Sequence, residues 1–233
     1  MVKVLKSYLL KIDRDLKENE FIYLLRLISP DKRSRILQYR DFKDAQQSIL
    51  AEILIRKYIK MYLGLSNDEI IFIKNIYGKP SLLNQNDFHF NISHSDKYII
   101  CIIDKAPVGI DIEMVKSVNL KIAKRFFSHN EFQYIINRTD NERLIAFYDI
   151  WTMKEAYAKY IGKGLSIYFK SFNVLEPMKN IFLHQILRTE HVICHAYTSS
   201  CKKMSVNILN VNELLNGFQE IRPERVQAKN LKT

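Results

Sequence analysis

Apolar residues in the first half of the chain recur with two different spacings, which predict a mixture of strands and helices. Residues 1–15 alternate between apolar and polar side chains, as in a strand with one buried face. The apolar positions of residues 15–28 and 41–63 recur at helical spacing, and the Ser29-Pro30 pair predicts the start of another helix. Strand-like runs follow at residues 70–76, 88–92 and 98–103.

The second half of the chain repeats this order of elements. Residues 108–113 predict a strand, and Ser128 with Glu131 has the spacing of a helix capping box. Helical patterns extend to residue 127 and over residues 128–136 and 141–161, and strand patterns follow at 171–175, 181–187, 192–198 and 204–209, with a short helix at 211–215. We therefore expect an α+β protein with an N-terminal half at residues 1–106, a C-terminal half at 107–217 and a flexible basic tail at 218–233.

The composition is typical of a folded protein without membrane contact. Hydrophobic residues make up 47% and charged residues 26% of the 233 positions. No apolar run approaches the roughly 18 residues of a membrane-spanning helix. The start of the chain lacks the cleavage site of a signal peptide, and the three cysteines show no disulfide spacing. These features favour the cytoplasm.

The chain carries a large excess of positive charge. Its 36 lysines and arginines against 25 acids give a formal net charge of +11. Such an excess favours anionic partners, which include nucleic acids, phosphorylated small molecules and acidic proteins. The charge alone does not choose among these partners, and part of it lies in the tail.

Asp111 and Glu113 are the sharpest local signal for chemistry. They lie two residues apart on a predicted strand, so their side chains point to the same face. Two carboxylates so close repel each other unless a cation lies between them, and Mg²⁺ prefers carboxylate oxygens and phosphates. A solvated strand end with two surface acids has the same spacing.

Glu155 and Lys159 are the second signal. They lie one turn apart on the same face of a predicted helix. They fit an ordinary surface salt bridge, which is worth little. They equally fit a site in which the acid joins a metal ion and the lysine holds a phosphate.

Ser93, His94 and Ser95 form the third signal. A histidine between two hydroxyl residues just past a predicted strand can bind phosphate, or it can form a structural turn. The chain has no Gly-x-Ser-x-Gly segment, which argues against a serine hydrolase.

Three cations in the first half, Lys32, Arg35 and Lys79, could together hold the phosphates of a nucleotide, although each alone fits an ordinary surface position. A zinc site is the weaker hypothesis for four residues of the second half: His191, Cys194, His195 and Cys201. Cys194 and His195 are adjacent on a predicted strand, so they point to opposite faces.

Taken in order, these residues resemble the surfactin-type (Sfp-type) 4′-phosphopantetheinyl transferases. Two segments are similar to the two parts of the family signature: residues 108–113 (VGIDIE) and residues 151–159 (WTMKEAYAK). The tryptophan of the second segment lies 40 positions after Asp111. Four further segments also resemble family motifs: residues 29–33, 77–80, 90–95 and 125–131. The similarity extends over about residues 20–175.

The resemblance implies a pseudodimer of two similar α+β halves with coenzyme A in the cleft between them. It implies that Asp111, Glu113 and Glu155 hold Mg²⁺, and that Lys159 and His94 contact the phosphates. It further implies a set of residues that hold the 3′-phosphate and the rest of the nucleotide: Lys32, Arg35, Ser48, Lys79 and Ser93.

The resemblance also implies a reaction. A serine of an apo acyl or peptidyl carrier protein attacks the phosphorus that bears pantetheine, and 3′,5′-ADP leaves. Glu155, Glu131 or a magnesium-bound water could act as the base. Gln47 stands where the family often has an arginine, which removes one cation beside Ser48.

The expected partners are coenzyme A and acidic carrier proteins rather than nucleic acid, and the length resembles the monomeric class. The carriers could serve fatty acid, polyketide or nonribosomal peptide (antibiotic) synthesis. Two rival functions stay open at this level: a magnesium-dependent nuclease and a non-catalytic binder of coenzyme A or carrier proteins. The lysine four residues after Glu155, and the lack of a basic-aromatic stripe, argue against the nuclease.

Overall fold

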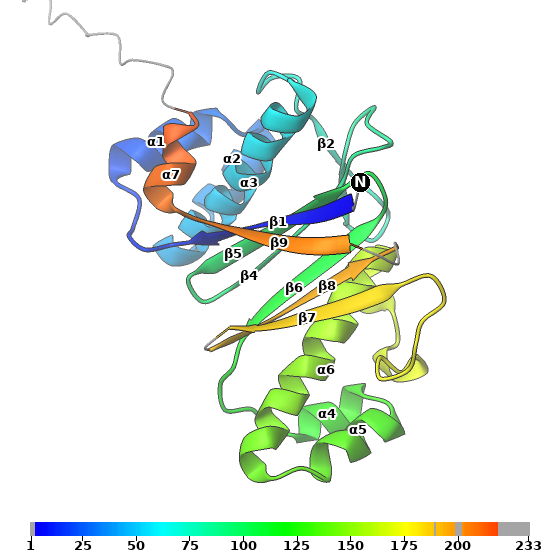
Figure 1. The fold of residues 1–233 in the computed structure, drawn as a ribbon. Coiled ribbons are helices and arrows are strands. Elements are labelled where there is room, and N and C mark those ends of the chain that lie inside the picture. Colours follow the sequence, from blue (N-terminus) through cyan, green and yellow to red (C-terminus); the bar gives the residue numbers. More distant parts are fainter. Residues whose placement is uncertain (1–2, 189, 199–201, 219–233) are drawn as a thin grey trace, which may run out of the picture.

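Two β-sheets lie next to each other at the centre of the molecule, and helices cover their outer sides (Figure 1). The computed structural model describes residues 3–188, 190–198 and 202–218. The first sheet has the order β4-β5-β1-β9 and contains β1 (Lys3–Lys11), β4 (His89–Ser95), β5 (Tyr98–Asp104) and β9 (Lys202–Asn210). The second sheet has the order β6-β8-β7 and contains β6 (Val108–Met114), β7 (Phe182–Arg188) and β8 (His191–Tyr197).

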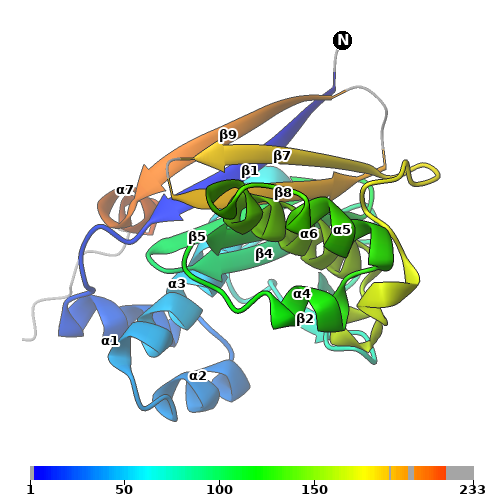
Figure 2. The same cartoon turned by 90° about the horizontal axis from the view of Figure 1, so that it is seen from below.

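Helices pack on both sheets. The first sheet is covered by α1 (Glu18–Arg26), α2 (Pro30–Leu37), α3 (Phe42–Leu63) and α7 (Val211–Asn216). The second sheet is covered by α4 (Lys121–Phe126), α5 (His129–Ile136) and α6 (Asp140–Ile161). The view from below looks onto α4, α5 and α6, which lie in front of the strands (Figure 2). Smaller elements complete the fold: β2 (Phe72–Lys74), β3 (Pro80–Leu82) and the 3-10 turns η1 (Gly164–Ser166) and η2 (Phe169–Ser171).

The two long helices begin and end for the same physical reasons. Asp41 accepts a hydrogen bond from the N–H of Lys43 at 2.8 Å and so caps the first turn of α3. The helix stops at Gly64, whose φ of 68° lies in the left-handed region that glycine adopts without strain. A capping box starts α6, and Gly162 ends it with a φ of 77°. The two halves therefore carry helices of matching design.

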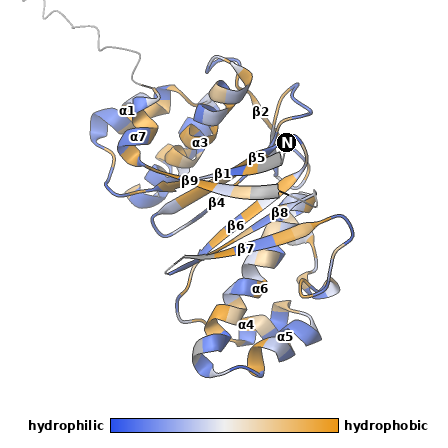
Figure 3. Ribbon diagram, in the orientation of Figure 1, coloured by the Kyte–Doolittle hydropathy of each residue, from blue (hydrophilic) through white to orange (hydrophobic). Residues whose placement is uncertain are grey.

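The strands of the first sheet face two cores. Tyr8 and Leu10 of β1 point toward α3, whereas Leu5 and Leu9 point toward the second sheet. The core between the sheets unites the two halves, and its buried members are Leu5, Leu9, Ile100, Ile102, Val108, Ile110, Ile112, Ile193 and Tyr197. Hydrophobic residues follow the strands where these layers meet (Figure 3).

The last strand returns to the first half of the molecule. β9 pairs in parallel with β1, and α7 buries Leu214 and Leu215 against the core beside α3. From the sequence we expected residues 202–216 to belong to the C-terminal half. In the structure they pack with the strands and helices of the first half instead. The predicted boundary at residues 106–107 stays a prediction.

The α+β prediction is confirmed, and one predicted strand is wrong. Residues 171–175 do not form a strand, because the chain there makes the turn η2 and then donates the Val174 N–H to Glu131 at 2.8 Å. The predicted run at 70–76 is a strand only at Phe72–Lys74. Most of the predicted tail, residues 219–233, lies outside the described residues. Among the described residues, no helix combines the length and apolar character needed to cross a membrane.

Candidate active site

Asp111 and Glu113 leave β6 on the face that meets α6, where they contact Lys159 and Trp151; their spacing had predicted a shared face. This approach depends on Gly109, two residues before Asp111. A Cβ atom at that position would lie 2.0 Å from the carbonyl oxygen of Ala156 and 2.5 Å from the N atom of Tyr160. Glycine therefore lets β6 pack directly on the backbone of α6, which brings the carboxylates close to side chains of that helix.

The Asp111 carboxylate is the centre of a hydrogen-bonded cluster. Ser93 Oγ donates to its Oδ1 at 2.8 Å, and Lys159 Nζ forms an ion pair with the same oxygen at 2.6 Å. Lys159 also donates to Ser93 Oγ at 2.9 Å. Asp111 is only 3% exposed, and its second oxygen, Oδ2, is buried with no hydrogen-bond partner among the described residues. A buried carboxylate oxygen without a partner is costly, which marks this atom for a ligand.

β4 supplies a row of polar side chains that hold the edge of β6. Asn91 Oδ1 accepts the Ile110 N–H at 2.9 Å, and Ser95 Oγ accepts the Met114 N–H at 2.9 Å. With Ser93 these residues alternate along β4, so all three face the neighbouring edge. The two sheets are thus joined at the site by side chains rather than by a backbone ladder. Sequence analysis had singled out Ser95 as a possible phosphate-binding residue and gave Asn91 no role, and it did not predict their contacts with β6, although their period of two was a signal for a shared face.

Glu113 lies half-buried next to Asp111. Ser95 Oγ donates to Glu113 Oε2 at 3.3 Å, and a side-chain hydrogen bond from Trp151 also reaches this acid. Burial and the charge of Asp111 raise the pKa of Glu113 above its ordinary value. Trp151 belongs to the motif at residues 151–159, but its contact with Glu113 was not predicted.

Glu155 carries the largest electrostatic shift of the site's carboxylates. Burial raises its pKa to about 7, and the charges of Asp111 and Glu113 act in the same direction against a smaller opposing effect of Lys159. Lys159 forms its ion pair with Asp111, so the predicted surface salt bridge within the helix is not the pairing that α6 adopts. Three carboxylates consequently share one small region with a single lysine beside them.

The residues fit a hard divalent cation in their chemistry. In the described part of the chain, no three histidine, cysteine or acidic groups are already gathered at metal-ligand distances. The donor set is nevertheless one that Mg²⁺ prefers, because it offers carboxylate oxygens and the unpartnered Oδ2 of Asp111. Burial is the main cause of the raised pKa values of Glu113 and Glu155, and the charge of Asp111 adds to it, so a bound cation would stabilise the ionised form of both acids.

His94 lies on β4 between the two halves. It is exposed and alternates with Ser93 and Ser95, so its ring leaves the strand on the opposite side. Desolvation by the groups around it lowers its pKa, and the charge of Lys159 adds to this effect. Asp44 and Lys32 of the first half also act on its pKa, which places the ring between α6 and the helices of the first half.

Lys32 and Ser48 form a separate group in the first half. Lys32 Nζ donates to Ser48 Oγ at 2.9 Å across α2 and α3. Burial lowers the pKa of Lys32, and the nearby cations Arg35 and Lys74 lower it further. Arg35 is exposed, and its Nε donates to the carbonyl of Asp31 at 3.3 Å. Lys74 is a cation of this group that sequence analysis missed, and its place on a short exposed strand gave no signal.

Lys79 binds backbone between the halves. Its Nζ donates to the carbonyl oxygens of Val108 at 3.2 Å and Tyr160 at 3.1 Å. Burial lowers its pKa to about 8. The lysine therefore joins the turn before β3 to the start of β6 and the end of α6, a structural role that its prediction as a nucleotide ligand did not include.

Glu131 lies outside the cluster. It is fully buried and forms an ion pair with Lys154 at 2.8 Å, and its oxygens also accept the N–H groups of Ser128 and Val174. Lys154, equally buried, donates to the carbonyls of Phe169 and Phe172. The structure thus shows Glu131 holding α5 and the segment after η1 to α6, with every oxygen occupied. Lys154 was quoted within a motif but was given no role.

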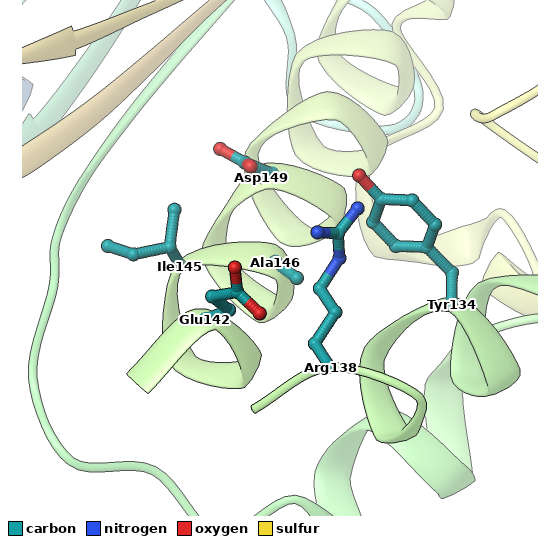
Figure 4. Close-up of a pocket in the computed structure, with 6 residues that line it drawn as sticks. All are labelled: Tyr134, Arg138, Glu142, Ile145, Ala146 and Asp149. Atoms are coloured by element: carbon teal, nitrogen blue, oxygen red, sulfur yellow. The ribbon is translucent and has the colours of Figure 1, made fainter. Parts of the chain in front are cut away.

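Two other groups of residues do not join this site. A pocket of about 290 Å³ between α5 and α6 contains Arg138, whose guanidinium lies 4.1 Å from the centre of the Tyr134 ring (Figure 4). None of the predicted site residues lines it. The weaker zinc hypothesis also fails among the described residues: Cys194 is a free buried thiol, and His195 Nε2 lies 3.2 Å from Ser7 Oγ. Cys201 lies outside the described residues.

Two family models match the chain in succession. The model described as "4'-phosphopantetheinyl transferase, N-terminal" matches residues 15–105. The model described as "4'-phosphopantetheinyl transferase superfamily" matches residues 107–207. The two matches meet where β5 ends and β6 begins, so each half of the site belongs to one of them.

Similarity to curated proteins extends over most of the chain. The 4'-phosphopantetheinyl transferase gsp of Aneurinibacillus migulanus is 35% identical over 229 residues, which cover 92% of this chain and 95% of that protein. The 4'-phosphopantetheinyl transferase Sfp of Bacillus subtilis (strain 168) is 39% identical over 170 residues, with 73% and 76% covered. The two successive family matches agree with the two-half α+β fold. The chain belongs to the 4′-phosphopantetheinyl transferase family, as its motifs predicted.

Proposed function

We propose that this enzyme transfers the 4′-phosphopantetheine group of coenzyme A to a serine of an apo acyl or peptidyl carrier protein and releases 3′,5′-ADP. The observation that carries the proposal is the convergence of Asp111, Ser93 and Lys159 from β6, β4 and α6 at the junction of the halves. The similarity over 92% of the chain to a protein named for this activity supports it.

Asp111, Glu113 and Glu155 would hold Mg²⁺ in this proposal. When bound, the ion supplies charge neutralisation and Lewis-acid stabilisation for the diphosphate of coenzyme A. The support comes from the chemistry of the acids: a buried unpaired oxygen on Asp111 and raised pKa values on the other two.

The remaining residues of the cleft bind and orient the substrate. Lys159 and His94 lie beside the acidic cluster, where their positive charge or N–H groups would contact phosphate oxygens. Lys32, Arg35 and Ser48 form the first-half group that would hold the nucleotide. Lys79 supports the cleft through its two backbone hydrogen bonds. Phosphoryl transfer needs mainly such positioning and charge neutralisation.

The proton of the attacking serine needs an acceptor at the cleft. Of the two side chains considered for this role, Glu131 is fully buried and paired with Lys154. Glu155 lies half-buried on the same face of α6 as Lys159. We therefore assign the acceptor role to the Glu155 carboxylate and a structural role to Glu131.

The partners follow from charge. The net charge of +11 would attract the acidic surface of a carrier protein, and the attraction should weaken with salt. We propose that the enzyme acts as a monomer in the cytoplasm and does not use nucleic acid as a partner.

One assay tests the function. The full chain is incubated with coenzyme A, Mg²⁺ and an apo carrier protein, and the mass of the carrier is measured. We expect the mass gain of one phosphopantetheine. A carrier of unchanged mass with several apo carriers would contradict the proposal, and cleavage of DNA in a parallel reaction would favour the nuclease instead.

A further inference from the structure

A second pocket lies between the two sheets, away from the acidic cluster. Its volume is about 300 Å³. One wall contains Ile112 of β6, the residue between Asp111 and Glu113. Because side chains alternate along a strand, Ile112 leaves β6 on the face opposite to these acids. The pocket is therefore separated from the proposed catalytic cleft by the strand itself.

The walls of this pocket are apolar and come from paired strand positions. Leu9 and Ile208 are register partners on β1 and β9, and Ile112 and Ile193 are register partners on β6 and β8. Ile208 is 56% exposed, although it is a large aliphatic residue on an edge strand. Such a surface gains free energy when a hydrocarbon covers it, at roughly 25 cal/mol per Å² of buried apolar area.

Two polar residues complete the pocket. His191 is only 5% exposed, and its Nε2 has no hydrogen-bond partner among the described residues. The ring of Tyr98 meets the His191 ring edge-on, with centroids 4.8 Å apart, and fixes its position. Lys11, the register partner of Tyr98, contributes an exposed ammonium group to the lining. A cation and an unpaired buried nitrogen thus lie beside an apolar wall.

We propose that this pocket binds a small amphipathic carboxylate. The hydrocarbon part packs between the Leu9–Ile208 and Ile112–Ile193 pairs, and the carboxylate accepts hydrogen bonds from Lys11 Nζ and His191 Nε2–H. The carboxylate then gives the unpaired histidine nitrogen a hydrogen-bond partner, and the hydrocarbon covers the exposed Ile208 side chain. A water molecule, with one non-hydrogen atom, occupies roughly 30 Å³ in the liquid. At that volume per atom, the pocket of about 300 Å³ holds about ten non-hydrogen atoms, which is the size of octanoate.

Octanoate is the probe for this site, and isothermal titration calorimetry with the full chain measures its binding. We expect saturable binding of one octanoate, and at least tenfold weaker binding of 1-octanol, which has the same chain without the charge. Lys11→Met should weaken octanoate binding by about tenfold and leave octanol binding unchanged. Lys105→Met, which removes an exposed lysine beyond the other end of β5, is the matched control and should bind octanoate normally.

A second variant tests the histidine. His191→Phe keeps an aromatic ring but removes the nitrogen, so it should also weaken octanoate binding at least tenfold, with thermal unfolding as the check of its fold. Equal affinities for octanoate and octanol, no saturable binding, or normal binding by Lys11→Met would overturn the proposal. Displacement of octanoate by coenzyme A would place the probe in the catalytic cleft and would overturn it too. The result is independent of transferase activity, because the readout is binding alone.

Discussion

The helices α3 and α6 have the same length and the same glycine stop, yet they treat their polar residues differently. In α3 the buried Arg56 pairs with Glu52 at 3.0 Å, and the buried Gln46 hydrogen-bonds to Asp15 and to the backbone of Leu16. Each of these groups is satisfied within the first half.

In α6 one charged residue has a partner of opposite charge, whereas the next residue lies among groups of like charge. Lys154 pairs with Glu131, whereas Glu155, the next residue, faces other acids and has its pKa raised to about 7. Two helices of one design therefore differ in whether their charges are paired locally. The acidic surroundings of Glu155 at the junction of the halves, rather than the helix itself, distinguish α6 from α3.

We expect the largest effect from a substitution that disrupts the contact between β6 and α6, because this contact brings the acids together. Gly109→Ala places a Cβ atom 2.0 Å from the Ala156 carbonyl oxygen, so the strand or the helix must move. We expect a loss of more than about 4 kcal/mol in the free energy of unfolding, in the range of the most disruptive substitutions. Urea denaturation measures it.

Gly217→Ala is the matched control for this glycine. Its new Cβ would lie 3.1 Å from the end of the Lys57 side chain, which can move, and in ordinary contact with the Leu214 carbonyl oxygen at 3.5 Å, so the stability should change by less than about 1 kcal/mol. Equal stability of the two variants would show that β6 does not need close contact with α6.

Asp111→Asn tests the acidic cluster that β6 presents to α6. The amide keeps the shape but loses the charge that pairs with Lys159 and would bind the metal ion. We expect transfer to fall by about 10³-fold, comparable to the loss of a key electrostatic contact, as measured by carrier mass over time.

Asp140→Asn removes an exposed acid at the start of α6 and should keep normal transfer. Transfer by Asp111→Asn at the rate of this control would remove Asp111 from the reaction.

Lys154→Met tests the buried ion pair between Lys154 of α6 and Glu131 of α5. It leaves the Glu131 carboxylate buried without its cation, which costs about 3 kcal/mol in stability. Thermal and chemical unfolding measure the loss, and the exposed Lys163→Met should show none.

Adding Glu131→Gln to Lys154→Met should recover part of the stability, because the buried charge is then removed. No recovery would mean that the lysine acts mainly through its bonds to the carbonyls of Phe169 and Phe172.

The most gradual effect, spread over several pH units, concerns the interface of the sheets. Burial lowers the pKa of His195 to about 3, against 6.5 in the unfolded chain. Between these values the unfolded state binds a proton that the folded state does not, so stability falls as pH decreases from 6.5 toward 3. The slope from this group is at most about 1.4 kcal/mol per pH unit.

His195→Gln should flatten that part of the stability curve relative to the wild type, when unfolding is followed from pH 7 to pH 4. Identical pH dependence of the two proteins would show that the histidine is already protonated in the folded state.

Much of the site could be predicted from local spacing. The period of two placed Asp111 and Glu113 on one face, and one helical turn placed Glu155 and Lys159 together. Which acid Lys159 pairs with could not be predicted, because it depends on how closely β6 approaches α6 through Gly109. The same holds for Glu131, whose capping-box spacing was correct but whose buried partner Lys154 comes from a different helix.

The order of elements in the fold was also accessible from the sequence, but their long-range pairing was not. Apolar periodicity predicted residues 204–209 as a strand without indicating that β9 lies beside β1, about two hundred residues earlier. Residues 171–175 contain β-favouring side chains, yet hydrogen bonds to Lys154 and Glu131 hold this segment in a turn. Tertiary contacts outweighed the local preference there.

The parallel pairing of β9 with β1 has a consequence for synthesis on the ribosome. The apolar cluster beneath α3 includes Leu209, Val211, Leu214 and Leu215, which are translated long after α3 itself. Until they do, the nascent N-terminal portion exposes the hydrogen-bonding edge of β1 and an incomplete hydrophobic layer, a state prone to association with other chains. The hydrophobic layer beneath α3 is therefore completed only after the strands of the second sheet have been translated.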